Sequence, residues 1–167
     1  MRTSILVTTL ALGFALASVP THPAHAQDYS ESRIIRSFDI GKLRAVVDAL
    51  DATIVEKSDG GYRITFANGT VSSAEFTACR DGGCLGTHMT ATFGKPSDKT
   101  VSQTEKIVRD HNRNNRTLTV YNLGEGRSQA DLYIIADGGI TMENYLRQLS
   151  LFAYSLKEYR RAIYTGG

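Results

Sequence analysis

The sequence has few of the residues that build metal centres and nucleic-acid sites. Its 167 residues include no Trp, two Cys, three Pro and four His, and beyond residue 26 the only histidines are His88 and His111. Two histidines make no metal site without further ligands. Its 19 Lys and Arg face 17 Asp and Glu, so the basic footprint of a nucleic-acid-binding protein is absent. We therefore expect no metal, no cofactor and no nucleic-acid partner.

Catalytic patterns are missing as well. Ser72, Ser73 and Ser102 have no Gly-x-Ser-x-Gly around them, and a serine without a placed base is not a nucleophile. Asp131 and Asp137 lie six residues apart, which leaves paired-carboxylate catalysis open, but no other residue supports it. The sequence thus predicts no catalytic residue and a protein that is not an enzyme.

The first 26 residues have the three parts of a secretory signal peptide. Arg2 supplies the positive start, Ile5–Val19 is an uncharged apolar run, and Ala24-His25-Ala26 is a small-x-small cleavage pattern. The alternative is a membrane anchor, but the run of about fifteen residues is shorter than the roughly 20 that span a bilayer. We predict a signal peptide at residues 1–26, a periplasmic or secreted protein, and no membrane span after cleavage.

The two cysteines, Cys79 and Cys84, flank the turn-rich sequence Arg-Asp-Gly-Gly. In an exported chain a nearby pair usually oxidises, and a metal site or a redox-active pair are the alternatives. We predict a disulfide that pins a hairpin. Because the closed loop is short, its chain-entropy gain is only about 2 kcal/mol.

Apolar periodicity divides the rest of the chain into elements in the order α-β-β-β-β-α-β-β-α. The predicted helices cover about residues 39–51, 97–114 and 141–163. The predicted strands cover about residues 52–57, 62–67, 71–78, 85–93, 117–123 and 130–136. Hairpin turns join most strands, so we expect an α+β fold with a mostly antiparallel sheet and helices packed on it. Residues 27–37 are polar and are predicted to be a flexible segment.

The hairpin at Asn68-Gly69 poses a problem of register. Asn-Gly is typical of a two-residue type I′ turn. With that turn, Ser73 would face inward, and the apolar residues Ala74 and Phe76 would face solvent. We predict a β-bulge near Ser72-Ser73 that restores the apolar residues to the inner face. In the next strand His88 lies opposite the apolar set, at an exposed or partner-covered position.

Four stretches of the sequence resemble the YbjN-domain family. They are the opening helix followed by a β-meander, the turn Cys79–Cys84 with the strand ending Thr90-Ala91-Thr92-Phe93, the run His111-Asn112-Arg113-Asn114-Asn115-Arg116, and Asp131-Leu132-Tyr133 with Gly138-Gly139-Ile140-Thr141 before a long helix. Together they span about residues 38–160, and residues 38–167 are identified as one YbjN-like domain. One departure is His111, where similar exported members carry Trp.

The resemblance implies a fold like that of type III secretion chaperones, with a homodimer formed through the terminal helix or an adjoining sheet. The family is described as sensory-transduction regulators without an established reaction. It therefore implies no catalytic residue.

Two groups of residues are candidates for binding. Asn112, Arg113 and Arg116 could form an anion clamp, because Arg binds carboxylates at two points, or they could hold the end of their helix. The last helix carries a seam at alternating spacings of four and three residues, which could contact a partner or cover the domain's own sheet. The seam candidates are Tyr145, Leu149, Phe152, Leu156 and Tyr159.

The sequence favours an exported, non-catalytic module that holds a protein or peptide partner in the cell envelope, in a chaperone-like or regulatory role. The alternative is a small periplasmic enzyme inhibitor or stress factor that acts through the disulfide-pinned hairpin, because a stiff loop loses little entropy on binding.

Overall fold

The computed structural model describes residues 29–165, and the predicted signal peptide lies outside the described residues. Its main sheet is antiparallel, with the strand order β2-β3-β4-β5-β7-β6. The strands are β2 (Thr53–Glu56), β3 (Tyr62–Thr65), β4 (Val71–Arg80), β5 (Gly83–Phe93), β6 (Thr119–Gly124) and β7 (Arg127–Ile135). The helices are α1 (Ile40–Ala49), α2 (Val101–Asn114) and α3 (Met142–Thr165). The predicted α+β class and antiparallel sheet are confirmed.

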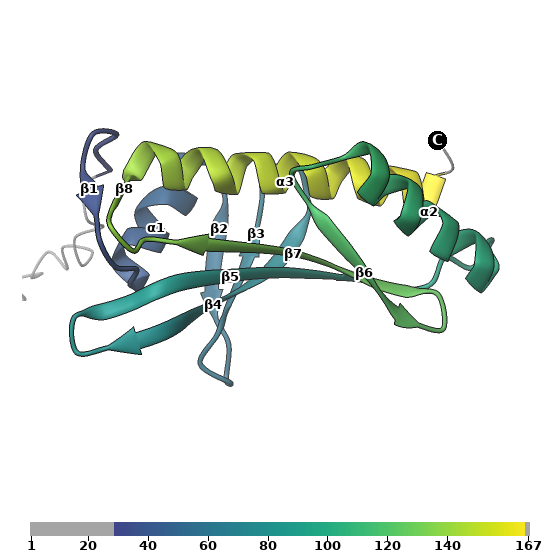
Figure 1. Ribbon diagram of the computed structural model, residues 1–167, viewed down its shortest axis with the longest axis horizontal. Coiled ribbons are helices and arrows are strands. Elements are labelled where there is room, and N and C mark those ends of the chain that lie inside the picture. Colours follow the sequence, from purple (N-terminus) through teal and green to yellow (C-terminus); the bar gives the residue numbers. More distant parts are fainter. Residues whose placement is uncertain (1–28, 166–167) are drawn as a thin grey trace, which may run out of the picture.

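The helices lie on one side of the sheet and leave the other side open (Figure 1). Along β5, Thr87, Met89 and Ala91 are buried, whereas His88 and Thr90 between them are only partly covered. This alternation follows from the two-residue period of a strand with one face on a core. The core therefore lies between the inner face of the sheet and α1 and α3.

Helix starts follow local capping chemistry. Asp39 caps α1 by accepting a hydrogen bond from the Lys42 backbone N–H, as the sequence predicts. The second helix begins at Val101, later than the predicted start at 97. Thr100 accepts from the Gln103 backbone N–H at 3.3 Å, and the Gln103 side chain accepts from Thr100 at 2.8 Å. This capping box fixes the start at Thr100.

The predicted bulge at Ser72-Ser73 is wrong. Pairing between β3 and β4 is regular through both serines, with Ile64 opposite Ser72 and Arg63 opposite Ser73. The reason is the turn length: Phe66 donates its backbone N–H to Thr70 O at 2.9 Å, so the loop holds three residues and not two. One extra loop residue shifts the register by one and turns Ala74 inward without a bulge.

Residues 31–35 form backbone contacts with the rest of the domain, contrary to the prediction of a flexible segment at residues 27–37, of which 27 and 28 lie outside the described residues. Ile34–Ile35 form strand β1, which pairs with β8 (Ile140–Thr141). The carbonyls of Arg33 and Glu31 accept hydrogen bonds from the first backbone N–H groups of α3, at 2.8 and 3.1 Å. These contacts satisfy helix donors that have no partner within the helix. Within residues 29–165, no helix is both long and apolar enough to cross a membrane.

Candidate functional site

The open face of the sheet is the candidate functional site. We define it as the side chains of β4, β5, β6 and β7 that point away from α3. Residues opposite each other in register share this face, as Glu75, His88 and Tyr133 do across β4, β5 and β7. The same rule adds Asp131, Gln129 and Tyr121 from the last two strands. The open face thus collects residues that lie far apart in the sequence.

A histidine between two carboxylates forms the centre of the open face. His88 Nδ1 lies 2.9 Å from Glu75 Oε1, and His88 Nε2 lies 3.2 Å from Asp131 Oδ2. Gln129 donates from its side-chain nitrogen to the other oxygen of Asp131 at 2.9 Å and orients that carboxylate. An ionised carboxylate only accepts, so both contacts are made best when each ring nitrogen carries a proton.

The surroundings of His88 favour its charged form. Partial burial by itself lowers the pKa of His88, but the hydrogen bonds and negative charges of Glu75 and Asp131 outweigh it and raise the pKa above its ordinary value of 6.5. In the described residues no group of three or more His, Cys, Asp or Glu has the arrangement of a metal site. The cluster therefore presents a hydrogen-bonded ionic centre on the surface.

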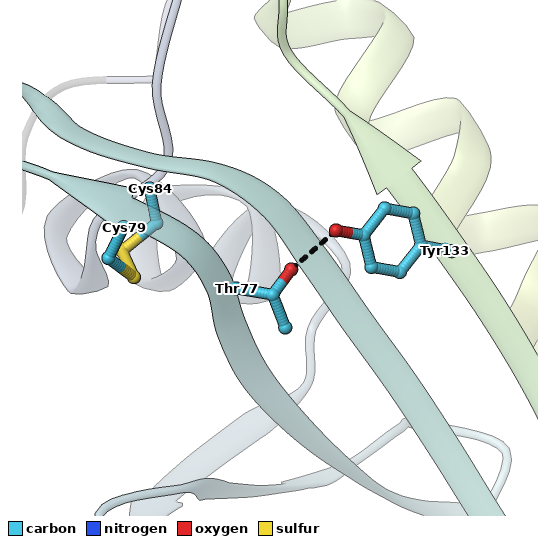
Figure 2. The surroundings of a disulfide bond; sticks show 4 residues. All are labelled: Thr77, Cys79, Cys84 and Tyr133. Carbon is cyan, nitrogen blue, oxygen red and sulfur yellow. Dashed lines mark hydrogen bonds between the residues drawn. A yellow bond between two sulfur atoms is a disulfide. The ribbon is translucent and has the colours of Figure 1, made fainter.

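Tyr133 forms a rigid platform beside this centre. Its hydroxyl lies 2.6 Å from Thr77 Oγ1, a contact that Figure 2 shows crossing over β5. The ring passes over Gly86, where a Cβ atom would lie only 2.2 Å from the Tyr133 oxygen. Glycine at 86 is therefore required for the ring to lie on the sheet.

Exposed apolar side chains surround the ionic centre. Tyr133 is 50%, Ile135 57% and Tyr121 49% exposed. Aromatic side chains fixed in place before binding lose little entropy when a partner covers them. The open face thus combines an ionic centre with apolar contact area, a composition suited to binding a polypeptide.

The disulfide hairpin lies where β4 ends and β5 begins. Cys79 and Cys84 are bonded, which confirms the predicted disulfide (Figure 2). Cys84 also exchanges two backbone hydrogen bonds with Phe38, at 2.6 and 3.2 Å. The tip residues Arg80 and Asp81 are exposed. The hairpin is thus a stiff projection tied to the start of α1.

The predicted clamp of Asn112, Arg113 and Arg116 is not assembled around Asn112. The Asn112 side chain donates to Val120 O at 2.7 Å and accepts from Val120 N–H at 2.9 Å. Its amide therefore ties the last turn of α2 to β6, the alternative role that the sequence left open. Arg113 and Arg116 are exposed on the surface.

The seam of α3 belongs to the core. All five candidates have no exposed surface: Tyr145, Leu149, Phe152, Leu156 and Tyr159. Tyr145 packs on Phe38 with ring centroids 4.8 Å apart, and Tyr159 packs on Phe93 at 4.9 Å. The partner-binding role considered for these five residues is therefore corrected: they cover the sheet of their own domain.

His111, the departure from the family pattern, is also a core residue. It lies edge-on to Tyr159 with ring centroids 4.9 Å apart, and its Nδ1 contacts the Asn115 side-chain nitrogen at 3.2 Å. Burial lowers the pKa of His111, which favours the neutral ring. His111 thus fills an aromatic position between α2 and α3.

Sequence reasoning missed most of the open face. The sequence predicts His88 on the strand face opposite the apolar set, and the structure confirms it. Its partner Asp131 lies 43 residues away and is brought beside it by the pairing of β5 with β7. Alternation along β7 was the only signal for Tyr133 and Ile135 as surface residues, and it gives no indication of what they lie beside.

A six-stranded antiparallel sheet with helices on one side and an open opposite face defines the chain as an α+β domain. Residues 39–165 match the family model of YbjN, described as "Putative bacterial sensory transduction regulator". The chain belongs to the YbjN family, as its sequence resemblance predicts. That description names a regulator and not a class of enzyme.

A solved structure supports the fold. The chain is similar to a protein described as "Crystal structure of YbjN, a putative transcription regulator from E. coli". The TM-score is 0.54 at 9% sequence identity, over 70% of this chain and 84% of that chain. No curated protein matches this sequence.

Proposed function

We propose that this protein is a non-catalytic binding module that holds a protein or peptide partner in the cell envelope, in a chaperone-like or regulatory role. The observation that carries the proposal is the open sheet face, where Tyr121, Tyr133 and Ile135 are about half exposed around the centre of Glu75, His88 and Asp131. Exposed apolar groups gathered on one face, with polar groups among them, are typical of protein-binding surfaces.

Two features support a location in the envelope. The first 26 residues have the pattern of a cleavable signal peptide. The Cys79–Cys84 disulfide is of a kind that persists in oxidising compartments. A partner in the periplasm or outside the cell follows from this location.

A test of the function is site-specific photocrosslinking in the bacterium that encodes the chain. A photoreactive amino acid is placed at position 135 on the open face, at position 154 on the outer side of α3, and at position 81 on the hairpin tip. Tyr154 is a matched control because it is exposed and apolar but lies on the helix side of the molecule. We expect a discrete crosslinked protein or peptide at position 135 in the periplasmic or secreted fraction, and none at position 154.

The same experiment decides the alternative function, an inhibitor or stress factor that acts through the hairpin. The observation that favours this alternative is that two sets of bonds hold the hairpin in place. They are the disulfide and the backbone hydrogen bonds between Cys84 and Phe38. Crosslinks at position 81 alone, lost when the neighbouring Arg80 is also replaced by Ser, would establish it. Absence of crosslinks at both 81 and 135 would overturn both functions.

A further inference from the structure

The sheet separates into two parts near the C-terminal end of α3. The ladder between β4 and β5 ends at the pair Ser73 and Thr90. Beyond it, β4 continues only with β3, as far as Val71, and β5 continues only with β7, as far as Phe93. Figure 1 shows β2 and β3 running across the direction of β5 and β7. The facing edges of the two strands are therefore not paired with each other at this end.

A cleft of about 870 Å³ lies at this separation. The β3–β4 turn and the start of β4, residues 68–71, form one wall. Thr92 and Phe93 at the end of β5 form another, and α3 from Lys157 to Thr165 forms the third. This volume lies in the range of clefts that bind small ligands.

The helix wall of the cleft carries an excess of positive charge. Lys157, Arg160 and Arg161 line it together with a single acid, Glu158. None of the three cations forms an ion pair within the described residues, and Arg160 donates only to the Gly69 carbonyl, at 3.5 Å. Lys157 and Arg161 are four residues apart, a spacing at which like charges on a helix repel. An anionic occupant would relieve this repulsion.

The other walls of the cleft are apolar or offer backbone. Phe93 and Tyr164 line the cleft with their ring centroids 6.5 Å apart, and Tyr164 donates its hydroxyl to Gly94 O at 3.1 Å. Val71 adds an exposed apolar side chain on the loop side. Extended peptides bind strand edges through main-chain hydrogen bonds and place alternate side chains in neighbouring pockets.

We propose that this cleft binds an extended acidic peptide segment, with its main chain against the edges of β4 or β5 and its carboxylates on Lys157, Arg160 and Arg161. The inference rests on the proposed function, because it names the chemistry of a peptide partner. It adds to the open face a second contact surface, which α3 lines.

The test uses the exported protein, labelled with ¹⁵N, and two hexapeptides with blocked ends. One alternates Glu and Val, and the other alternates Lys and Val. A six-residue strand spans about 20 Å. We expect the Glu-Val peptide to shift amide signals of residues 68–71, 92–93 and 157–165, and the Lys-Val peptide to leave them unchanged.

Arg161→Gln should weaken binding of the Glu-Val peptide about tenfold, the loss of one charge-assisted contact. Arg147→Gln, an exposed arginine earlier on the same helix, should change binding less than twofold.

Three results would overturn the cleft proposal. They are no shifts in the cleft with the Glu-Val peptide, equal binding by the Arg161→Gln variant, or saturation by inorganic phosphate at the same concentration as the peptide, which would assign the cleft to small anions. Failure here with crosslinks retained at position 135 leaves the proposed function standing. Peptide binding in the cleft without crosslinks at 81 or 135 would overturn the proposed function of the open face and leave the cleft as a peptide site.

Discussion

His88 gains its environment from three strands. Glu75 on β4 and Asp131 on β7 contact its two ring nitrogens, while the neighbouring Tyr133 ring lies 6.0 Å away between centroids. The same residue type at position 111 has the opposite environment, because burial there leaves Nε2 without a hydrogen-bond partner among the described residues. Two histidines of one chain are thus tuned in opposite directions by their neighbours.

The raised pKa of His88 predicts a pH-dependent contribution to stability. The folded state binds the proton more tightly than the unfolded chain, so the contribution is fully present below about pH 6.5, the unfolded value. It is lost as pH rises through the folded pKa, which lies above 6.5. We expect His88→Gln to be less stable than the natural chain at pH 6 by no more than about 1 kcal/mol, because Glu75 is largely exposed.

The measurement is urea unfolding of both chains from pH 6 to pH 9. The difference in free energy of unfolding should shrink toward higher pH. Glu75→Gln is the control, because it removes one of the two negative charges beside His88. It should reduce the pH dependence of stability without abolishing it. A difference that grows with pH would contradict the assignment of charge at His88.

At the scale of the element, the sequence predicts α3 well. The four-three spacing of apolar residues gives a long helix, and Thr141 accepts a hydrogen bond from the Asn144 backbone N–H at its start, as a cap. The spacing does not distinguish a seam that faces the core from one that faces a partner, because a core and a partner interface both require apolar residues at these positions. Only the packing of α3 over the sheet resolves this.

A matched pair of leucines tests the seam. Leu149 has no exposed surface and Leu151, two residues further along the same helix, is 51% exposed. We expect Leu149→Ala to lower the free energy of unfolding by about 2–5 kcal/mol, the effect of removing buried methyl groups. Leu151→Ala should change it by less than about 0.5 kcal/mol. Chemical denaturation measures both, and equal effects would mean that Leu149 is not in the core.

The β3–β4 hairpin shows a different limit at this scale. The sequence Asn-Gly predicts a turn, and a turn is present, with Gly69 at a φ of 77°. The number of residues in the loop was not predictable from the pair itself. Asn68 also donates to Ala153 O on α3 at 2.9 Å, a tertiary contact 85 residues away that holds the loop in place.

At the scale of the whole molecule, the two ends of the domain depend on each other. Ile35 is 2% exposed and packs in the core, while its neighbour Ile34 is 62% exposed. The polar composition of residues 27–37 predicts a flexible segment because one buried isoleucine gives no periodic signal. The pairing of β1 with β8, more than a hundred residues apart, exists only in the folded chain.

We expect deletion of residues 27–36 to lower the free energy of unfolding by about 2–5 kcal/mol, since it removes a buried isoleucine. Amide hydrogen exchange at Met142 and Glu143 should become faster, because the carbonyls of Arg33 and Glu31 that accept from them are lost. Ile34→Ala is the control and should leave stability and exchange unchanged. Unchanged protection in the deleted chain would show that β1 is not required.

The sequence by itself determined the helices, most of the strands, the disulfide and the class of fold. These follow from apolar periodicity, capping residues and cysteine spacing, which are all local along the chain. Tertiary structure decided the loop length at Asn68-Gly69, the burial of the α3 seam, and the pairing of Ile34–Ile35 with β8. It also decided the meeting of Glu75, His88 and Asp131. Each of these depends on contacts between residues distant in sequence, whose geometry is set only when the sheet and helices pack together.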